Sequence, residues 1–215
     1  MPFASNDPIH KENRIGAWTP MRHPVFRMLW IAILFVNIAS WMQDVGAGWL
    51  MTSLAPTPAM VSLVQAATST PFFLLAIPAG ALADIVDRRR FLIATQIWLA
   101  CCAGALGFLT LTGLTSSILL LVFTFCLGVG LAMMMPACGA VFSAHVPRDE
   151  LQSAVALNSI AINIARSVGP AIAGIIVAAA GSGAVFLTNA AFYAIVTFLT
   201  IRWNRNVVQS ELPSE

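Results

Sequence analysis

The sequence predicts an all-α, polytopic membrane protein built as a bundle of six transmembrane helices. Three observations support this prediction: an apolar composition, six apolar stretches of membrane-spanning length, and basic residues confined to alternate connections. Of the 215 residues, 59% are hydrophobic and 9% are charged, whereas a soluble domain averages about 45–50% apolar and about 25% charged residues. A soluble core of this size could not hide so much apolar surface, and hydrocarbon does not require it to be hidden.

A bilayer core about 30 Å thick is crossed by roughly 20 apolar residues in a helix. The crossings are expected at residues 28–50, 59–83, 91–111, 118–142, 154–179 and 184–201. Three regions follow from this assignment: a cytoplasmic N-terminal tail over residues 1–24, a six-helix transmembrane domain over residues 25–203, and a cytoplasmic tail or truncated central linker over residues 204–215.

The basic residues predict how the chain is oriented. Every Lys and Arg except Arg166 lies before the first predicted crossing, after the last one, or in one of two connections, at residues 84–90 and 145–150. The alternate connections, at residues 55–58, 112–117 and 181–183, carry no charge. Because basic loops stay on the cytoplasmic side, we expect a multi-pass protein of the cell (inner) membrane with both termini in the cytoplasm.

Several classes of function lack support in the sequence. No basic stripe interleaved with aromatic residues is present, so nucleic-acid binding is not expected. The four cysteines lie within apolar runs without zinc-like spacing, and the three histidines lie outside the predicted helices. No nucleophile–base arrangement and no phosphate-binding glycine loop is found. We therefore expect no enzyme, no metal site and no cofactor.

The connection over residues 80–90 places two acids and three arginines between two predicted helices. A topology anchor at the anionic cytoplasmic face explains the arginines at 88–90. It does not explain Gly80 and Asp84 at the membrane edge. An acid there can cap the N-terminus of a neighbouring helix and pair with a loop arginine, and such contacts would break when helices slide past each other.

The fifth predicted helix carries a second candidate motif. Ala165, Gly169 and Ala173 recur every four residues, a spacing that lets a partner backbone approach closely. Pro170 removes a helix hydrogen bond and allows a bend. The pattern is explained either by ordinary packing of small residues or by a bending seam between two halves of a transporter.

Both stretches resemble motifs of the major facilitator superfamily. The first is similar to the loop between the second and third helices of these transporters, and Asp87 replaces the usual glycine. The matching residues are Gly80, Leu82, Asp84, Arg88, Arg89 and Leu92. Residues 165–174 resemble the G-P-x-x-G motif of the antiporters in the superfamily, and residues 26–30, 71–75 and 147–151 resemble its enterobactin-exporter-like branch.

The resemblance implies that the chain has the fold of the N-terminal six-helix half of such a transporter. It implies a conformational-switch loop with Gly80, Asp84, Arg88 and Arg89, and a helix-bending motif with Gly169, Pro170 and Gly174. The implied function is secondary active transport, as proton-coupled export of small apolar compounds such as siderophores or drugs.

Complete members of the superfamily have two halves with a binding site between them, and this sequence ends where a central linker would begin. The alternatives are therefore a non-transporting membrane subunit or a truncated product that needs a second six-helix half. The expected partners are the lipid bilayer, a small-molecule substrate, and a second six-helix half or a second copy in a homodimer.

Two formal charges, Asp44 and Arg166, fall within the predicted helices, where an ionised side chain costs roughly 2.5–3.5 kcal/mol. At 1.5 Å per residue they lie about 24 and about 20 Å from the cytoplasmic ends of their helices, so they can meet if the first and fifth helices are neighbours. They either form a static buried ion pair or line the transport cavity. A proton-carrying Asp44 must become neutral in one state, whereas a tight pair with Arg166 would keep it ionised.

Uncharged polar residues within the helices are softer candidates for the same pathway. They are Asn37, Gln43, Gln65, Asn158 and Asn163. An Asn in a membrane helix more often hydrogen-bonds a neighbouring helix than a substrate. Asn163 lies three residues before Arg166, so both side chains are expected on a similar face.

Overall fold

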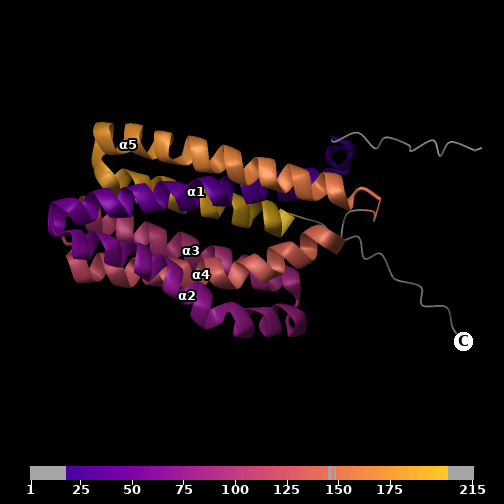
Figure 1. Ribbon diagram of the computed structural model, residues 1–215, viewed down its shortest axis with the longest axis horizontal. Helices are drawn as coiled ribbons and strands as arrows, with labels where there is room; N and C mark the ends of the chain where they lie inside the picture. The colour runs from indigo at the N-terminus through magenta and orange to yellow at the C-terminus, as the bar shows by residue number, and fades with distance from the viewer. Residues whose placement is uncertain (1–17, 145–146, 148, 203–215) are drawn as a thin grey trace, which may run out of the picture.

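The computed structural model describes residues 18–144, 147 and 149–202, without the side chains of Asp84 and residues 137–144. The described chain is a bundle of long helices (Figure 1). A short 3₁₀ helix, η1 (Thr19–Arg22), precedes five α-helices. These are α1 (Pro24–Leu54), α2 (Pro58–Ile85), α3 (Arg88–Leu111), α4 (Ser117–Ala144) and α5 (Leu151–Arg202).

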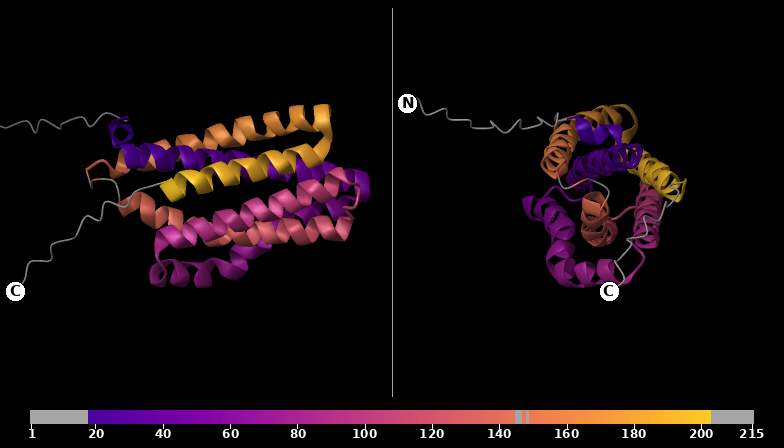
Figure 2. Two further views of the ribbon diagram at one scale, coloured as in Figure 1. Left: turned by 180° about the vertical axis from the view of Figure 1, so that it is seen from behind. Right: turned by 90° about the vertical axis from the view of Figure 1, so that its right-hand side faces the viewer.

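Helix α5 supplies two of the six crossings because the chain folds back within it (Figures 1 and 2). Its 52 helical residues are interrupted at Gly181, whose φ of 78° and ψ of 173° are not helical. A positive φ favours glycine because glycine has no Cβ. The first part of α5 (residues 151–180) and the second part (residues 182–202) extend about 45 and about 31 Å, so each can cross the hydrocarbon. The predicted six-helix membrane bundle is confirmed.

The observed helices extend beyond the predicted apolar stretches because their ends are set by caps rather than by hydrophobicity. Proline occupies the first turn of α1 and of α2, where its missing N–H is not needed. The Thr57 hydroxyl accepts a hydrogen bond from the Met60 N–H at the start of α2. The Asp87 carboxylate accepts one from the Arg90 N–H at 3.0 Å. Asp87, which replaces a glycine of the loop signature, therefore serves as the N-cap of α3.

The first part of α5 runs parallel to α1 in a constant register. His23 Nε2 lies 3.1 Å from a carboxylate oxygen of Glu150, a pair 127 residues apart. The Trp30 indole N–H donates to the Leu157 carbonyl at 2.8 Å, again 127 residues apart. Gly169 then meets α1 at Trp41. One register therefore holds from the ends of the two helices into the middle of the bundle.

Gly169 allows the backbones of α1 and α5 to approach closely. A Cβ added there would lie 2.7 Å from the Trp41 Cβ, closer than real Cβ atoms pack, and 3.2 Å from the Ile38 carbonyl oxygen, which is tighter than most real contacts. Gly174, in the same motif, would have nothing within 4 Å. Pro170 lies inside the helix, where the backbone remains helical. Gly169 is thus a packing contact, whereas Gly174 contacts no other helix in this conformation.

Glycines mark the other tight helix contacts as well. Gly107 of α3 packs against Leu187 of the second part of α5, and Gly128 of α4 packs against the Thr68 carbonyl of α2. Gly46 of α1 packs against Phe186. Small residues at such interfaces are typical of membrane helices, which gain van der Waals contact by close approach.

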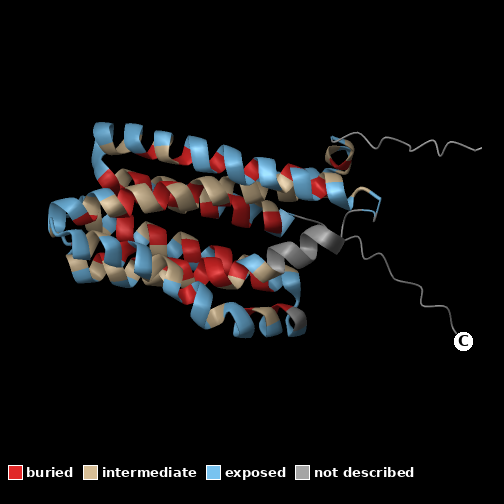
Figure 3. Ribbon diagram, viewed as in Figure 1, coloured by how far each residue is buried: buried red, intermediate tan, exposed pale blue. Residues whose placement is uncertain are grey.

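Many of the exposed positions on the helices (Figure 3) carry large apolar side chains. Phe73 is 85% exposed, Ile77 87% and Ile175 70%. The interior core joins α1, α2, α3, α4 and the second part of α5 through residues such as Val64, Leu99 and Phe186. Exposing so many large apolar side chains to water would cost free energy, whereas hydrocarbon solvates them without this cost.

Replacing Gly169 by alanine is expected to destabilise the protein by about 1–3 kcal/mol, because the added methyl group overpacks the contact with Trp41. The matched Gly174→Ala variant enters open space and should be neutral or stabilise the helix by up to about 1 kcal/mol. Thermal unfolding of both variants in detergent measures the difference. Equal melting temperatures would contradict the assignment of Gly169 to a tight contact.

Candidate functional site

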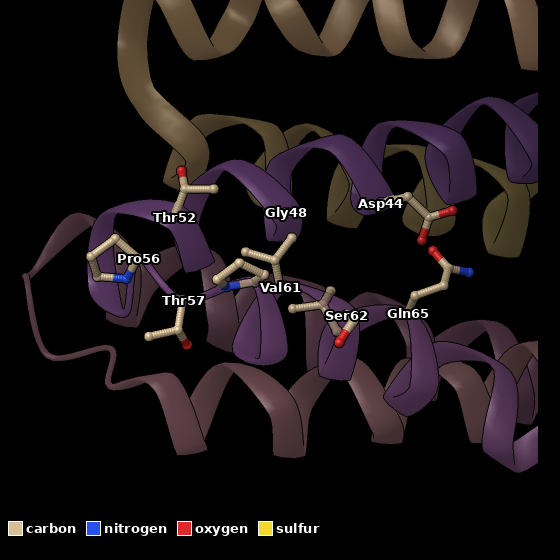
Figure 4. Close-up of a pocket in the computed structure, with 10 residues that line it drawn as sticks. Asp44, Gly48, Thr52, Pro56, Thr57, Val61, Ser62 and Gln65 are labelled. Atoms are coloured by element: carbon tan, nitrogen blue, oxygen red, sulfur yellow. The ribbon is translucent and has the colours of Figure 1, made fainter.

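A groove of about 710 Å³ separates α1 from α2 near the connection that joins them. Asp44, Gly48 and Thr52, four residues apart, line it from α1, because residues at this spacing share one helix face. The connection and α2 supply the other side (Figure 4). These lining residues are Pro56, Thr57, Pro58, Val61, Ser62, Val64 and Gln65.

Asp44 is half-buried at the inner end of this groove. The Gln65 side chain points toward it from α2 (Figure 4). Asp44 makes no ion pair and no hydrogen bond with any residue that the structure describes. A carboxylate at this depth must be hydrated, protonated or bound to a positively charged group to avoid the cost of an isolated charge in hydrocarbon. The groove is the open space that borders Asp44.

A buried amide pair lies beside Asp44, between α1 and the second part of α5. The Asn189 side-chain N–H donates to Gln43 Oε1 at 3.1 Å, and the two residues are 0% and 7% exposed. Gln43 Nε2 and Asn189 Oδ1 have no hydrogen-bond partner among the described residues. Tyr193, one turn after Asn189, is also fully buried. The second part of α5 therefore places buried polar side chains in the interior of the bundle, and one of them bonds the residue that precedes Asp44.

Asn189 and Tyr193 were not predicted as site residues. They lie four residues apart within the sixth predicted crossing, so they share one helix face. Their polarity within an otherwise apolar stretch was the signal that could have identified them.

Asp44 and Arg166 do not form the ion pair considered from the sequence. With the register of 127 residues, Arg166 lies level with Ala39, about 8 Å along the helix axis from Asp44. Arg166 is exposed and donates to Asn163 Oδ1 at 2.8 Å. Residue spacing gave the depth of each charge but neither the stagger nor the rotation of the two helices, and both separate the charges here.

Two of the predicted asparagines, Asn37 and Asn163, donate their side-chain N–H groups within their own helices. Asn37 donates to the Ile33 carbonyl and Asn163 to the Ser159 carbonyl, each at 2.8 Å and one turn back in its own helix. Asn163 and Arg166 share an exposed face of α5, as their spacing predicted. The structure therefore brings together Asp44 with Gln65 and Asn163 with Arg166, but it does not bring all the predicted residues into one cavity.

The predicted switch loop contacts the end of the last crossing. The Arg89 guanidinium donates to the carbonyls of Thr200, at 3.3 Å, and Ile201. The Thr200 hydroxyl donates to Gln96 Oε1 of α3 at 3.2 Å. Because the last carbonyls of a helix lack backbone partners, a cation at this position caps the helix. A Cβ on Gly80 would meet open space, and the Asp84 side chain lies outside the described residues.

Arg89→Gln should loosen the last turn of α5, because a charged donor to two carbonyls is lost at a partly exposed site. The expected loss is about 1 kcal/mol, or amide exchange about fivefold faster at residues 200–202. The matched control is Arg90→Gln, which also removes one positive charge but from an exposed side chain. It should leave amide exchange at residues 200–202 unchanged. Hydrogen–deuterium exchange in detergent makes the comparison, and equal effects would rule out the cap.

Comparison with known proteins agrees with this architecture. A family model described as transmembrane secretion effector, within the major facilitator superfamily, matches residues 15–215. The chain is 29% identical over 166 residues to the staphyloferrin A transporter of Staphylococcus aureus (strain NCTC 8325 / PS 47), a match that covers 76% of this chain and 42% of the relative. The chain thus spans about two-fifths of the length of this curated relative. It belongs to the transmembrane secretion effector family of the major facilitator superfamily.

Proposed function

We propose that this chain forms one six-helix half of a secondary active transporter that exports small apolar compounds, such as siderophores or drugs, in exchange for protons. Membership of a secretion family and similarity to a protein named as a staphyloferrin A transporter support transport. The observation that carries the proposal is the Asp44 carboxylate, which has no ion pair with a described residue and lines an open groove between membrane-spanning helices.

The environment of Asp44 supports a role in proton coupling. A proton carrier must gain and lose its charge during the cycle, and a fixed salt bridge would prevent this. Asp44 has no such bridge to a described residue, and Arg166 is bonded to Asn163 instead. The buried Gln43–Asn189 pair places polar groups next to Asp44 in the chain.

The side of the membrane to which the groove opens follows from the charge of the connections. It lies beside the uncharged α1–α2 connection, whereas the charged connections lie at the opposite ends of the helices. If the basic loops and both termini are cytoplasmic, as we propose from their charge, this groove opens to the outside of the cell. Two helix contacts, Gly169 with α1 and Arg89 with the end of α5, would then break and re-form as the transporter changes between its outward-open and inward-open states.

The exposed face of α5 supports a need for a second six-helix half. Arg166 and Asn163 are exposed within a membrane crossing, and a charge facing lipid is costly. A second half, or a second copy in a homodimer, would cover this face. The chain spans only 42% of the relative's length. The alternative to a transporter half is therefore a non-transporting subunit, or a truncated product that needs this partner. Size measurement of the purified chain in detergent distinguishes a monomer from a dimer.

Asp44→Asn should abolish the dependence of efflux on a proton gradient, because the amide cannot carry a proton at this position. The measurement is efflux of a fluorescent apolar compound from proteoliposomes with and without an imposed pH gradient, with any second half co-reconstituted. Asp44→Glu, which retains a carboxyl group, is the matched control and should keep the dependence. An Asp44→Asn protein that still responds to the pH gradient would remove the proton role.

A further inference from the structure

We propose that Cys102 of α3 and Cys126 of α4 form an interhelical dithiol site that binds an uncharged trivalent arsenical through both sulfur atoms. This site lies apart from the groove between α1 and α2, and it does not rest on the proposed function. It follows from the register of α3 and α4, the environment of the two thiols and the chemistry that this environment permits.

The register of α3 and α4 places the two thiols at the same level. The helices lie side by side and antiparallel (Figure 2). The Trp98 indole N–H donates to the Cys126 carbonyl at 2.8 Å, and a Cβ added at Gly130 would lie 2.9 Å from Trp98 Cδ1. Cys102 lies four residues after Trp98 along α3, and Cys126 lies four residues before Gly130 along α4. Because the helices are antiparallel, these equal steps reach the same level.

The two thiols also lie on the sides of α3 and α4 that face each other. Residues four apart share one helix face, so Cys102 shares the face of Trp98 and Cys126 shares the face of Gly130. These faces meet where Trp98 packs against Gly130. Both cysteines are free and only partly exposed, whereas Cys101 is exposed. Cys101 lies on a different face, because consecutive residues of a helix do not face the same way.

The surroundings restrict what the two thiols can bind. Residues 91–142 contain no charged side chain. Cys102 lies about 21 Å from the start of α3 and about 14 Å from its end, well within the hydrocarbon, where a bound group that left a net charge would be costly. A zinc ion would need about four ligands, and no group of three metal-ligating side chains occurs among the described residues. The bound group should therefore be neutral and need two thiolates.

Trivalent arsenic that carries one organic group meets both requirements. Thiolates are soft ligands, which suit such a centre. With an arsenoxide, R–As=O, two S–H bonds break and two S–As bonds form, and the oxygen takes both protons and leaves as water. Arsenic stays trivalent and the adduct has no charge. Because both thiols are partly exposed, an uncharged arsenoxide dissolved in the lipid can reach them.

The test treats the full chain in detergent with phenylarsine oxide. The background carries Cys138→Ser, because the Cys138 side chain lies outside the described residues. Excess 2-mercaptoethanol is then added, and intact-protein mass spectrometry follows the adduct. We expect one phenylarsenic group per chain, released at least about tenfold more slowly than from a chain that keeps one of the two cysteines, because the second S–As bond forms within the molecule. Dimercaptopropanol, which offers two thiols, should remove it.

The variants identify the two sulfur atoms. Cys102→Ser and Cys126→Ser should each abolish the resistance to 2-mercaptoethanol, whereas Cys101→Ser is the matched control and should keep it. Peptide mapping of the adduct on the chain that retains all three cysteines keeps the proposal testable if a variant does not fold, because the arsenic should join Cys102 to Cys126. Release as fast as from the single-cysteine chains, resistance that survives either substitution, or an arsenic bridge from Cys101 to Cys102 would overturn the proposal.

Discussion

The parallel packing of α1 against the first part of α5 is the contact on which the rest of the structure depends. His23–Glu150 and Trp30–Leu157 fix one register near the helix starts, and Gly169 continues it into the membrane by letting the backbones meet. This register places Arg166 level with Ala39 rather than Asp44. Asp44 is consequently left to the opposite side of α1, where α2 diverges and the groove forms.

The energetics of charge in hydrocarbon connect this packing to chemistry. An ionised side chain there is costly unless water, a proton or a counter-ion compensates it. Arg166 is exposed on α5 and donates to Asn163. Asp44 has no hydrogen bond or ion pair with a described residue and faces the groove between α1 and α2 instead. The two charges inside the crossings therefore have different surroundings: one lies beside a polar neighbour on an exposed helix face, and the other lies beside an open groove.

Much of the fold could be predicted from the sequence because the bilayer constrains it so strongly. Apolar length gave the crossings, and the glycine-rich link at residues 181–183 gave the reversal that the structure places at Gly181. The small-residue spacing around Gly169 indicated a close helix contact, which the structure confirms.

The site was harder to predict because it depends on how helices rotate and stagger. Asp44 and Arg166 could be identified as unusual charges, but their relative height depends on the register with α5. The amide pair of Gln43 and Asn189 joins residues 146 apart in the chain, and a sequence alone does not indicate which polar residues meet across a bundle. The Arg89 contact with the end of α5 also joins residues far apart in the chain, so the sequence alone does not indicate it.

Access of water to position 44 in the membrane-embedded protein tests the central claim most directly. A cysteine introduced as Asp44→Cys would be treated with a membrane-impermeant thiol reagent, and Ala105→Cys on an exposed face of α3 would serve as the lipid-facing control. The background would carry serine in place of Cys101, Cys102, Cys126 and Cys138. The groove predicts rapid labelling at position 44 and none at position 105. Protection of position 44 to the same extent as position 105 would contradict it.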